Sequence, residues 1–284
     1  NFNTWTEIEV STLDRNKSII TSSQQLDNSD GIKPQTNGIP IAISLLFILL
    51  LTVAAQIGSL AFTSSTGDKD FQSIVLPSIT ALCLVTLPLA GLGIWLGRKV
   101  GLGIPLLTAL FLKQPGSWKR LGEDAKIAII FGLVLGGLLV LVRVLTESYL
   151  PPELPAYGHR GVLGGLLVSV GAAIGEEVWF RLGLMTILVW LLMRLLGHQE
   201  LRPIVVWTII LVTSIGFGLA HLPQLLSYGA GSLVGVMGTI FGNTIVGILY
   251  GWCYWRRSLV AAILAHFSVD IALHVIPAIF SKVG

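Results

Sequence analysis

Long apolar runs without a charged residue are the feature that most limits how this chain can fold. Residues 39–62, 73–97 and 232–255 contain no Asp, Glu, Lys or Arg, and each run is long enough to cross about 30 Å of hydrocarbon as a helix. Charged residues make up 12% of the chain, about half the share found in a soluble domain. We therefore expect an integral membrane protein, and we exclude a disordered chain, a nucleic-acid-binding surface and a small disulfide-rich secreted fold.

Four further apolar segments predict additional spans. They comprise residues 127–142, 161–196, 204–220 and 258–280. Segment 161–196 either crosses the membrane once as a long bent helix or breaks near Arg181 into two. The expected fold is therefore an all-α bundle of seven to eight transmembrane helices.

Two segments between the spans lack the length or the apolar character to cross. Residues 100–112 are apolar but too short, so we expect a re-entrant or interfacial segment. Residues 113–126 are polar, which predicts a loop or an amphipathic segment lying on the membrane surface. Cys83 and Cys253 fall inside apolar runs, which predicts buried thiols rather than a disulfide or a metal pair.

The distribution of Lys and Arg predicts how the chain is oriented. Six of its eighteen basic residues lie between Arg98 and Lys126, and loops rich in Lys and Arg stay in the cytoplasm. Two spans precede this region, so the polar N-terminal tail, residues 1–38, is also expected in the cytoplasm, where it is a candidate docking segment for a protein partner. The net charge of +3 then needs no nucleic acid to explain it. Residues 39–284 form one multi-helix membrane domain.

Ionisable residues inside apolar spans are costly and are therefore candidates for function. The first group is Glu176-Glu177-xxx-Arg181. Glu177 and Arg181 are four residues apart on one helix face, which predicts a structural ion pair. Glu176 lies about 100° around the helix and is left as the free carboxylate, suited to act as a general base. The alternative is a purely structural polar network.

The other polar groups lie on three later helices. Phe217-xxx-His221 ends one span, and His266-xxx-Asp270 places two polar side chains on one face of the last span. Asp270 could orient His266, bind a metal or donate a proton as a neutral acid. Asn243 either supports such a site or makes one polar contact in helix packing.

The ordered set of these motifs resembles the CPBP family, the CAAX protease and bacteriocin-processing (Abi) intramembrane proteases, over residues 161–270. The resemblance implies an endopeptidase that cleaves a membrane-associated peptide or protein, with its protease-like core at 161–280. It implies that Glu176 and His221 activate the attacking water, and that His266 and Asp270 stabilise the oxyanion. Asn is commonest in the family at the position of Asp270, and an ionised Asp cannot donate to an oxyanion.

Several alternatives stay open at this stage. Water activation without a metal is the favoured mechanism, but two His with carboxylate ligands are also a plausible zinc set, here His221 and His266 with Glu176 and Asp270. The chain lacks the zinc-protease motif HExxH. A non-catalytic scaffold, immunity or assembly factor of the same fold is the main alternative function, and a small proton-coupled transporter is the third. Neither a prenylated nor another substrate is favoured by the sequence.

A depth count divides the candidate residues. At 1.5 Å per residue, Glu176 and His221 lie roughly 27–29 Å from Arg194 and Arg202. His266 lies only about 14 Å from Arg257. Straight helices starting at one membrane surface would therefore keep His266 apart from the other two.

Overall fold

The computed structural model describes residues 40–66, 70–198 and 200–280. The predicted tail, residues 1–38, lies outside the described residues. Within the described residues the regular secondary structure is helical throughout, which confirms the all-α fold.

Seven helices of the described residues are long and apolar enough to cross a membrane. They are α2 (Ile41–Thr66), α3 (Phe71–Val100), α5 (Ser117–Thr146), the composite of α6 (Gly161–Glu177), the π-helix η2 (Val178–Met185) and α7 (Thr186–Leu195), α8 (Pro203–Ala220), α10 (Leu233–Arg256), and the composite of α11 (Leu259–Asp270), the π-helix η3 (Ile271–Val275) and α12 (Ile276–Phe280). Short helices lie in the connections: α4 (Pro105–Phe111), the 3₁₀ helix η1 (Glu147–Tyr149) and α9 (Leu222–Ser227). The chain is thus a multi-pass integral membrane protein.

The helix boundaries settle two points that the sequence left open. The fourth span stays helical through Arg181, so it counts as one of seven candidate crossings rather than as two. The prediction of a loop or surface segment over 113–126 is wrong for residues 117–126, which form the first turns of α5. The polar start of α5 is held within the bundle because Asp124 is buried there and accepts a hydrogen bond from Ser258 at 2.9 Å.

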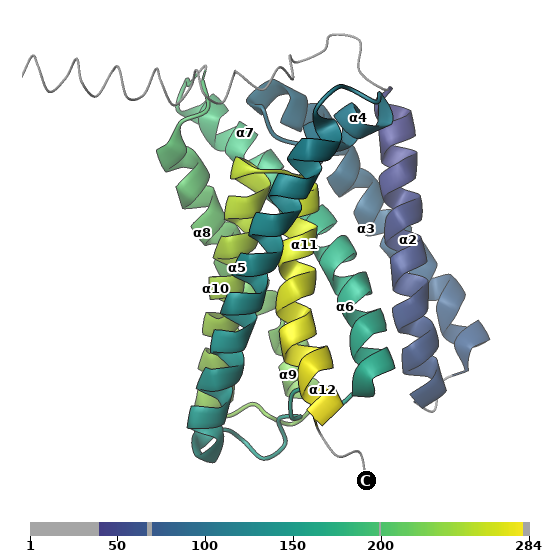
Figure 1. Ribbon diagram of the computed structural model, residues 1–284, viewed down its shortest axis with the longest axis vertical. Coiled ribbons are helices and arrows are strands. Elements are labelled where there is room, and N and C mark those ends of the chain that lie inside the picture. Colours follow the sequence, from purple (N-terminus) through teal and green to yellow (C-terminus); the bar gives the residue numbers. More distant parts are fainter. Residues whose placement is uncertain (1–39, 67–69, 199, 281–284) are drawn as a thin grey trace, which may run out of the picture.

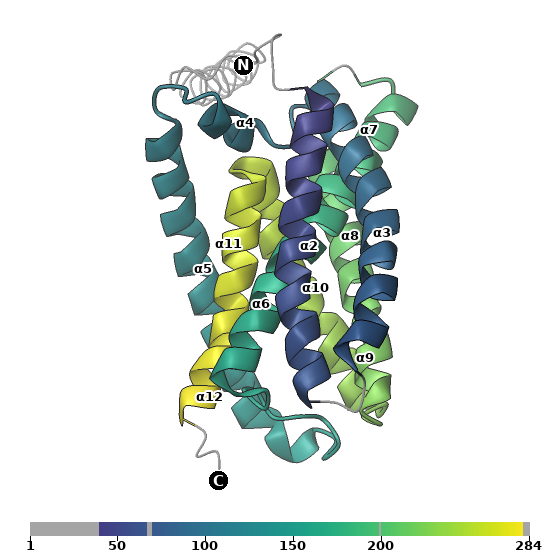
Figure 2. The same cartoon turned by 90° about the vertical axis from the view of Figure 1, so that its right-hand side faces the viewer.

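The last span lies at the centre of the bundle (Figure 1). Helix α11 contacts α5, α6 and α10, while α2 and α3 pack against α6 and η2 on one side and α8 packs against α10 on the other. In Figure 2, turned by 90°, α5 and α3 lie on opposite sides of α11. The four sequence motifs therefore come from neighbouring helices.

Two glycines bring α5 close to α11, as their four-residue spacing predicts. A Cβ on Gly132 would lie 2.5 Å from the carbonyl oxygen of Ala265, and one on Gly136 would lie 2.6 Å from the Cβ of Ala272. Both distances are shorter than real side chains allow, so the close approach of these helices depends on glycine.

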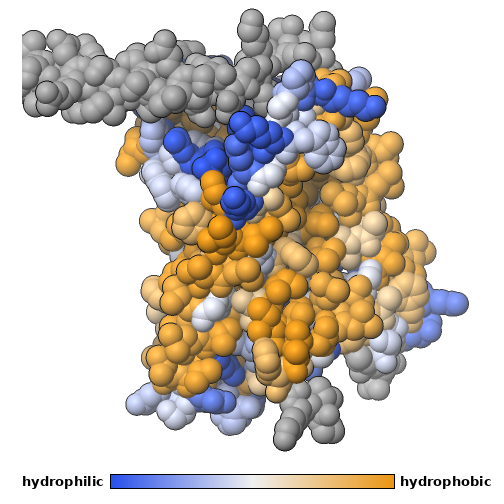
Figure 3. Space-filling view, viewed as in Figure 1, coloured by the Kyte–Doolittle hydropathy of each residue, from blue (hydrophilic) through white to orange (hydrophobic). Residues whose placement is uncertain are grey.

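The outer surface has the pattern of a membrane protein. Figure 3 shows a broad hydrophobic band with hydrophilic side chains at both ends. Many large apolar side chains on the outside are more than half exposed, among them Leu76, Leu84, Leu138 and Ile204. Such a surface is suited to hydrocarbon rather than water.

Candidate active site

Glu177 joins two of the predicted groups. It is the last residue of α6 and is fully buried. One carboxylate oxygen, Oε2, lies 3.2 Å from Nε of Arg181, and the other, Oε1, lies 2.8 Å from Nδ1 of His266. The ion pair with Arg181 is present as the spacing predicts. The bond to His266 was not predicted, and it means that Glu177 helps to fix the orientation of this imidazole.

Arg181 is buried in a shell of aromatic rings and one backbone carbonyl. Its Nη2 donates to the carbonyl oxygen of Gly247 at 2.9 Å. Its guanidinium carbon lies 4.8 Å from the ring centre of Phe217 and 5.3 Å from that of Tyr250. A buried guanidinium with a carboxylate, a carbonyl and π-faces around it is a fixed structural element. It connects the fourth span to α8 and α10.

His266 presents its second nitrogen to two other carboxylates. Its Nε2 lies 3.9 Å from Oε2 of Glu176 and 3.7 Å from Oδ2 of Asp270. The imidazole stacks on Tyr250, with ring centres 4.5 Å apart and an interplanar angle of 11°. Glu177 on one side and Tyr250 on one face therefore hold the ring while Nε2 faces the centre of the site.

His221 is oriented by its own helix. Its Nδ1 lies 2.8 Å from the carbonyl oxygen of Phe217, and since a carbonyl only accepts, the hydrogen is on Nδ1. In the neutral ring Nε2 then carries the lone pair, and it lies 3.9 Å from Oε2 of Glu176. The Phe217 ring is buried 4.7 Å from the His221 ring centre and 5.9 Å from that of His266. Phe217 thus spaces the two histidines.

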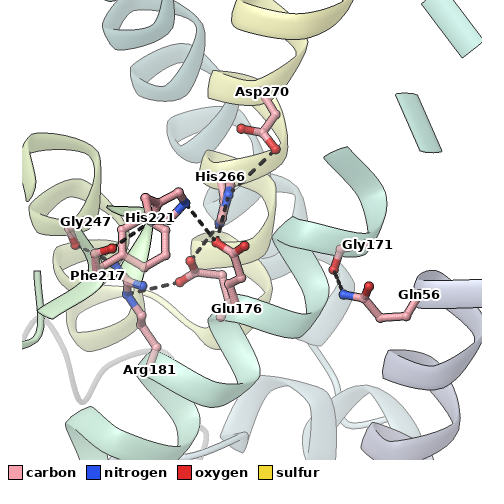
Figure 4. Close-up of polar contacts among 10 residues, drawn as sticks. Gln56, Gly171, Glu176, Arg181, Phe217, His221, Gly247, His266 and Asp270 are labelled. Carbon is pink, nitrogen blue, oxygen red and sulfur yellow. Dashed lines mark hydrogen bonds and ion pairs between the residues drawn. The ribbon is translucent and has the colours of Figure 1, made fainter. Parts of the chain in front are cut away.

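Glu176 lies where these groups converge (Figure 4). Its Oε2 is buried and makes no hydrogen bond within the described residues, although about a quarter of the side chain is exposed. The 3.9 Å from this oxygen to each histidine Nε2 is too long for a direct hydrogen bond. This separation leaves room for one small polar atom that hydrogen-bonds both to Glu176 and to a histidine.

Each composite span changes to a π-helix directly after its candidate carboxylates. Segment η2 follows Glu177, and η3 follows Asp270. The extra residue in a π-turn rotates the helix face beyond it, and such segments recur at functional sites. No pattern in the sequence predicted either one.

A chain of hydroxyl groups stabilises η2. The Thr186 hydroxyl donates to the carbonyl oxygen of Arg181 at 3.1 Å and lies 2.7 Å from the Tyr254 hydroxyl. That hydroxyl accepts from the backbone N–H of Gly103 at 2.8 Å. Because the Arg181 carbonyl only accepts, the donors run in one direction, from Gly103 through Tyr254 and Thr186 to Arg181.

The structure brings the candidates together except for Asn243. The Asn243 side chain donates to the carbonyl of Thr239 in its own helix at 2.9 Å, and in the described part of the chain it makes no bond to the carboxylates or histidines. Tyr250 is the site residue that the sequence reasoning missed. It lies seven residues after Asn243, two helical turns along the same face, and this spacing could have identified it.

The depth count separated His266 from Glu176 because it took Arg257 as a marker of the membrane surface. Arg257 lies 3.9 Å from Asp124, whose carboxylate also accepts from Ser258. These bonds hold the turn between α10 and α11 inside the bundle, below α4 and the start of α2 in both ribbon views (Figures 1 and 2). Helix α11 starts deeper than was assumed, so His266 reaches the level of Glu176.

A mainly apolar cavity of about 330 Å³ lies beside the site. Helices α2 and α3 and the η2 residue Trp179 form its walls. Gln56, at its edge, donates to the carbonyl of Gly171 at 2.8 Å, five residues before Glu176 in the same helix. The indole N–H of Trp179 donates to Thr86 at 2.9 Å. These two bonds connect α2 and α3 to the helix that carries the carboxylates.

The donor set does not have the arrangement of a metal centre. Within the described residues, no group of three or more His, Cys, Asp or Glu side chains could hold a metal ion. Nδ1 of His266 is bonded to Glu177, which leaves one nitrogen of this ring for any ligand.

One comparison with known proteins gave a match. Residues 159–272 match the family described as Type II CAAX prenyl endopeptidase Rce1-like. The matched segment contains every candidate residue considered above, from Glu176 to Asp270. No curated protein and no solved structure matches the chain.

Proposed function

We propose, from the match of residues 159–272 to the Rce1-like family and from the geometry of the site, that this chain is an intramembrane endopeptidase of the CPBP type acting on a membrane-associated peptide or protein. Glu176 and His221 would activate the attacking water. The observation that carries the proposal is the buried, unbonded Oε2 of Glu176, 3.9 Å from Nε2 of both His221 and His266.

The proposed reaction uses Glu176 as the base. A water molecule donates one hydrogen bond to Oε2 of Glu176 and another to the lone pair on Nε2 of His221. Its oxygen attacks the carbonyl carbon of the scissile peptide while Glu176 takes the proton. The proton then passes to the leaving nitrogen as the carbon–nitrogen bond breaks. Each step balances without a cofactor.

His266 is proposed to stabilise the oxyanion. It donates from Nε2 when the ring carries both protons, and the Glu177 carboxylate 2.8 Å from Nδ1 stabilises that form. A donor fixed in place before the reaction is the kind that lowers the barrier most. Asp270, 3.7 Å from the same Nε2, joins this role only when it is protonated, because an ionised carboxylate has no proton to donate.

The test compares the termini of membrane proteins in cells that carry the native chain or Glu176→Ala at equal abundance. A new terminus that is present with the native chain and lost in the variant supports the proposal and identifies the substrate. Identical termini together with an unaltered phenotype would instead support the non-catalytic scaffold. Identical termini with a lost phenotype would mean that Glu176 acts in something other than peptide hydrolysis.

A further inference from the structure

The two ends of the bundle differ in charge. One end holds the start of α2, the end of α3, α4 and the turn between α10 and α11, and the other holds α9 and α12 (Figures 1 and 2). Most described basic residues lie at or near the first end, which we call the basic end: Arg98, Lys99, Lys113, Lys119, Arg120, Lys126, Arg194, Arg202, Arg256 and Arg257. Among the described residues, Arg143 and Arg160 are the basic ones at the opposite end. This asymmetry predicts that the basic end is cytoplasmic.

The bundle is closed between the candidate site and the basic end. Every helix that carries a site residue continues toward that end with side chains that are almost inaccessible. They are Leu182, Met185 and Val189 after Glu177, Val205, Val206 and Ile210 before Phe217, Cys253 and Tyr254 after Tyr250, and Leu259, Ala261 and Ala262 before His266. A peptide has no route to Glu176 through these layers unless the core is repacked.

On the other side of the site, one face of α10 is loosely packed. In residues 233–245 of α10, one residue, Gly235, is buried. Met237 and Phe241 in the same stretch are 55% and 69% exposed. A Cβ on Gly238 or on Gly242 would meet nothing within 4 Å. One face of this half of α10 is therefore open, while the other packs closely on α8, where a Cβ on Gly218 would lie 2.6 Å from the carbonyl oxygen of Ile240.

His221 lies in the turn that faces this opposite end. It follows the last residue of α8 and precedes α9, and its side chain is 27% exposed. Just beyond it, the Tyr228 hydroxyl accepts hydrogen bonds from Arg160 and Gln224, each at 3.1 Å. Burial and the neighbouring charge of Arg160 lower the pKa of His159. Polar groups thus surround the end of the bundle nearest to His221.

We infer that substrates enter the site from the end that holds α9 and α12, and that this end faces away from the cytoplasm. This inference rests on the proposed function. The substrate is then a peptide or membrane protein whose scissile segment lies on the non-cytoplasmic side of the membrane. An extended segment from that side passes along the exposed half of α10 and brings its carbonyl carbon to Glu176.

The test is the side from which a cysteine at position 176 can be labelled. In a Cys83→Ala, Cys253→Ala background, Glu176→Cys is treated in intact cells with a maleimide that cannot cross membranes. Gln224→Cys marks the α9 end, and Lys119→Cys, whose native side chain is 81% exposed, marks the basic end. We expect Glu176→Cys and Gln224→Cys to be labelled in intact cells, and Lys119→Cys only after permeabilisation.

Three results would overturn the inference. In the first, Glu176→Cys is labelled only after permeabilisation, together with Lys119→Cys. In the second, Lys119→Cys is labelled in intact cells. In the third, Glu176→Cys is labelled under neither condition while Gln224→Cys reacts. If Glu176→Cys does not accumulate, His221→Cys gives the same measurement. Labelling requires no catalysis, so a protein that fails to cleave but labels as expected would refute the proposed function and leave the access route standing.

Discussion

Two adjacent carboxylates in this chain have opposite surroundings. Glu177 is hydrogen-bonded to His266 through Oε1 and forms an ion pair with Arg181 through Oε2 at 3.2 Å, without a hydrogen bond. Oε2 of Glu176 has no hydrogen bond within the described residues, and each histidine Nε2 that it faces is 3.9 Å away. The two proposed roles, stability for Glu177 and chemistry for Glu176, therefore fall on neighbouring positions. A pair of isosteric substitutions can distinguish the two roles.

Glu177→Gln is expected to destabilise the protein, because removing one partner of a buried ion pair costs about 3–5 kcal/mol. Glu176→Gln is the matched control and should stay within about 1 kcal/mol of the native protein while losing cleavage, since its side chain is partly exposed. Thermal unfolding in detergent measures the first effect, and a cleavage assay measures the second. Equal melting temperatures for the two variants would contradict the assigned roles.

Asp270→Asn tests the role of the least typical residue in the site. The amide keeps the size of the side chain near Nε2 of His266 and adds an N–H that can donate to an oxyanion. We expect unchanged or higher cleavage activity, measured together with the metal content of the purified protein. Loss of activity accompanied by loss of bound zinc would support the metal mechanism instead.

At the scale of elements, the hydroxyl chain from Gly103 to Arg181 fixes the π-helix that follows Glu177. Tyr254→Phe leaves the buried N–H of Gly103 without its acceptor, at a cost of about 1–3 kcal/mol. Thr186→Val removes the donor to the Arg181 carbonyl. Both variants should lower kcat more than they raise KM, because they act on the position of catalytic groups.

A double-mutant cycle shows whether the hydroxyl groups of Tyr254 and Thr186 act as one connected chain or as two independent contacts. If Tyr254 and Thr186 act in series, the double variant should lose little more activity than the worse single variant. Thr208→Val is the matched control, because the Thr208 hydroxyl bonds only within its own exposed turn, to Ile204 at 2.9 Å. Additive losses, or an equal loss in the control, would refute the positioning role.

Helix α5 offers a test of packing with a neighbouring control. Gly136→Ala places a methyl group against Ala272 and Val269 of the last span, and overpacking of this kind costs typically about 1–3 kcal/mol. Gly137→Ala meets nothing within 4 Å and should be neutral or slightly stabilising. Melting temperatures in detergent compare the two, and equal values would mean that α5 and α11 separate without cost.

At the scale of the whole molecule, the features that the sequence predicted are those that depend on residues close together in one helix. The spans follow from uncharged runs, and the Glu177–Arg181 pair follows from a four-residue spacing. The bond from Glu177 to His266 and the recessed turn at Arg257 depend on contacts between helices that are distant in sequence. The polar start of α5 was misread for the same reason, because only Ser258 and Arg257 show why Asp124 can be buried.

The number and direction of the crossings give the last prediction. Seven crossings with a cytoplasmic basic end place the two termini on opposite sides, because an odd number of spans reverses the side of the chain. Green fluorescent protein, which fluoresces only in the cytoplasm of a bacterial host, should fluoresce when fused to the N-terminus and stay dark at the C-terminus. Alkaline phosphatase, active only outside the cytoplasm, should show the reverse. Two cytoplasmic termini would require eight crossings and a break in the fourth span, whereas exchanged results would reverse the orientation and bring the α9 end to the cytoplasm.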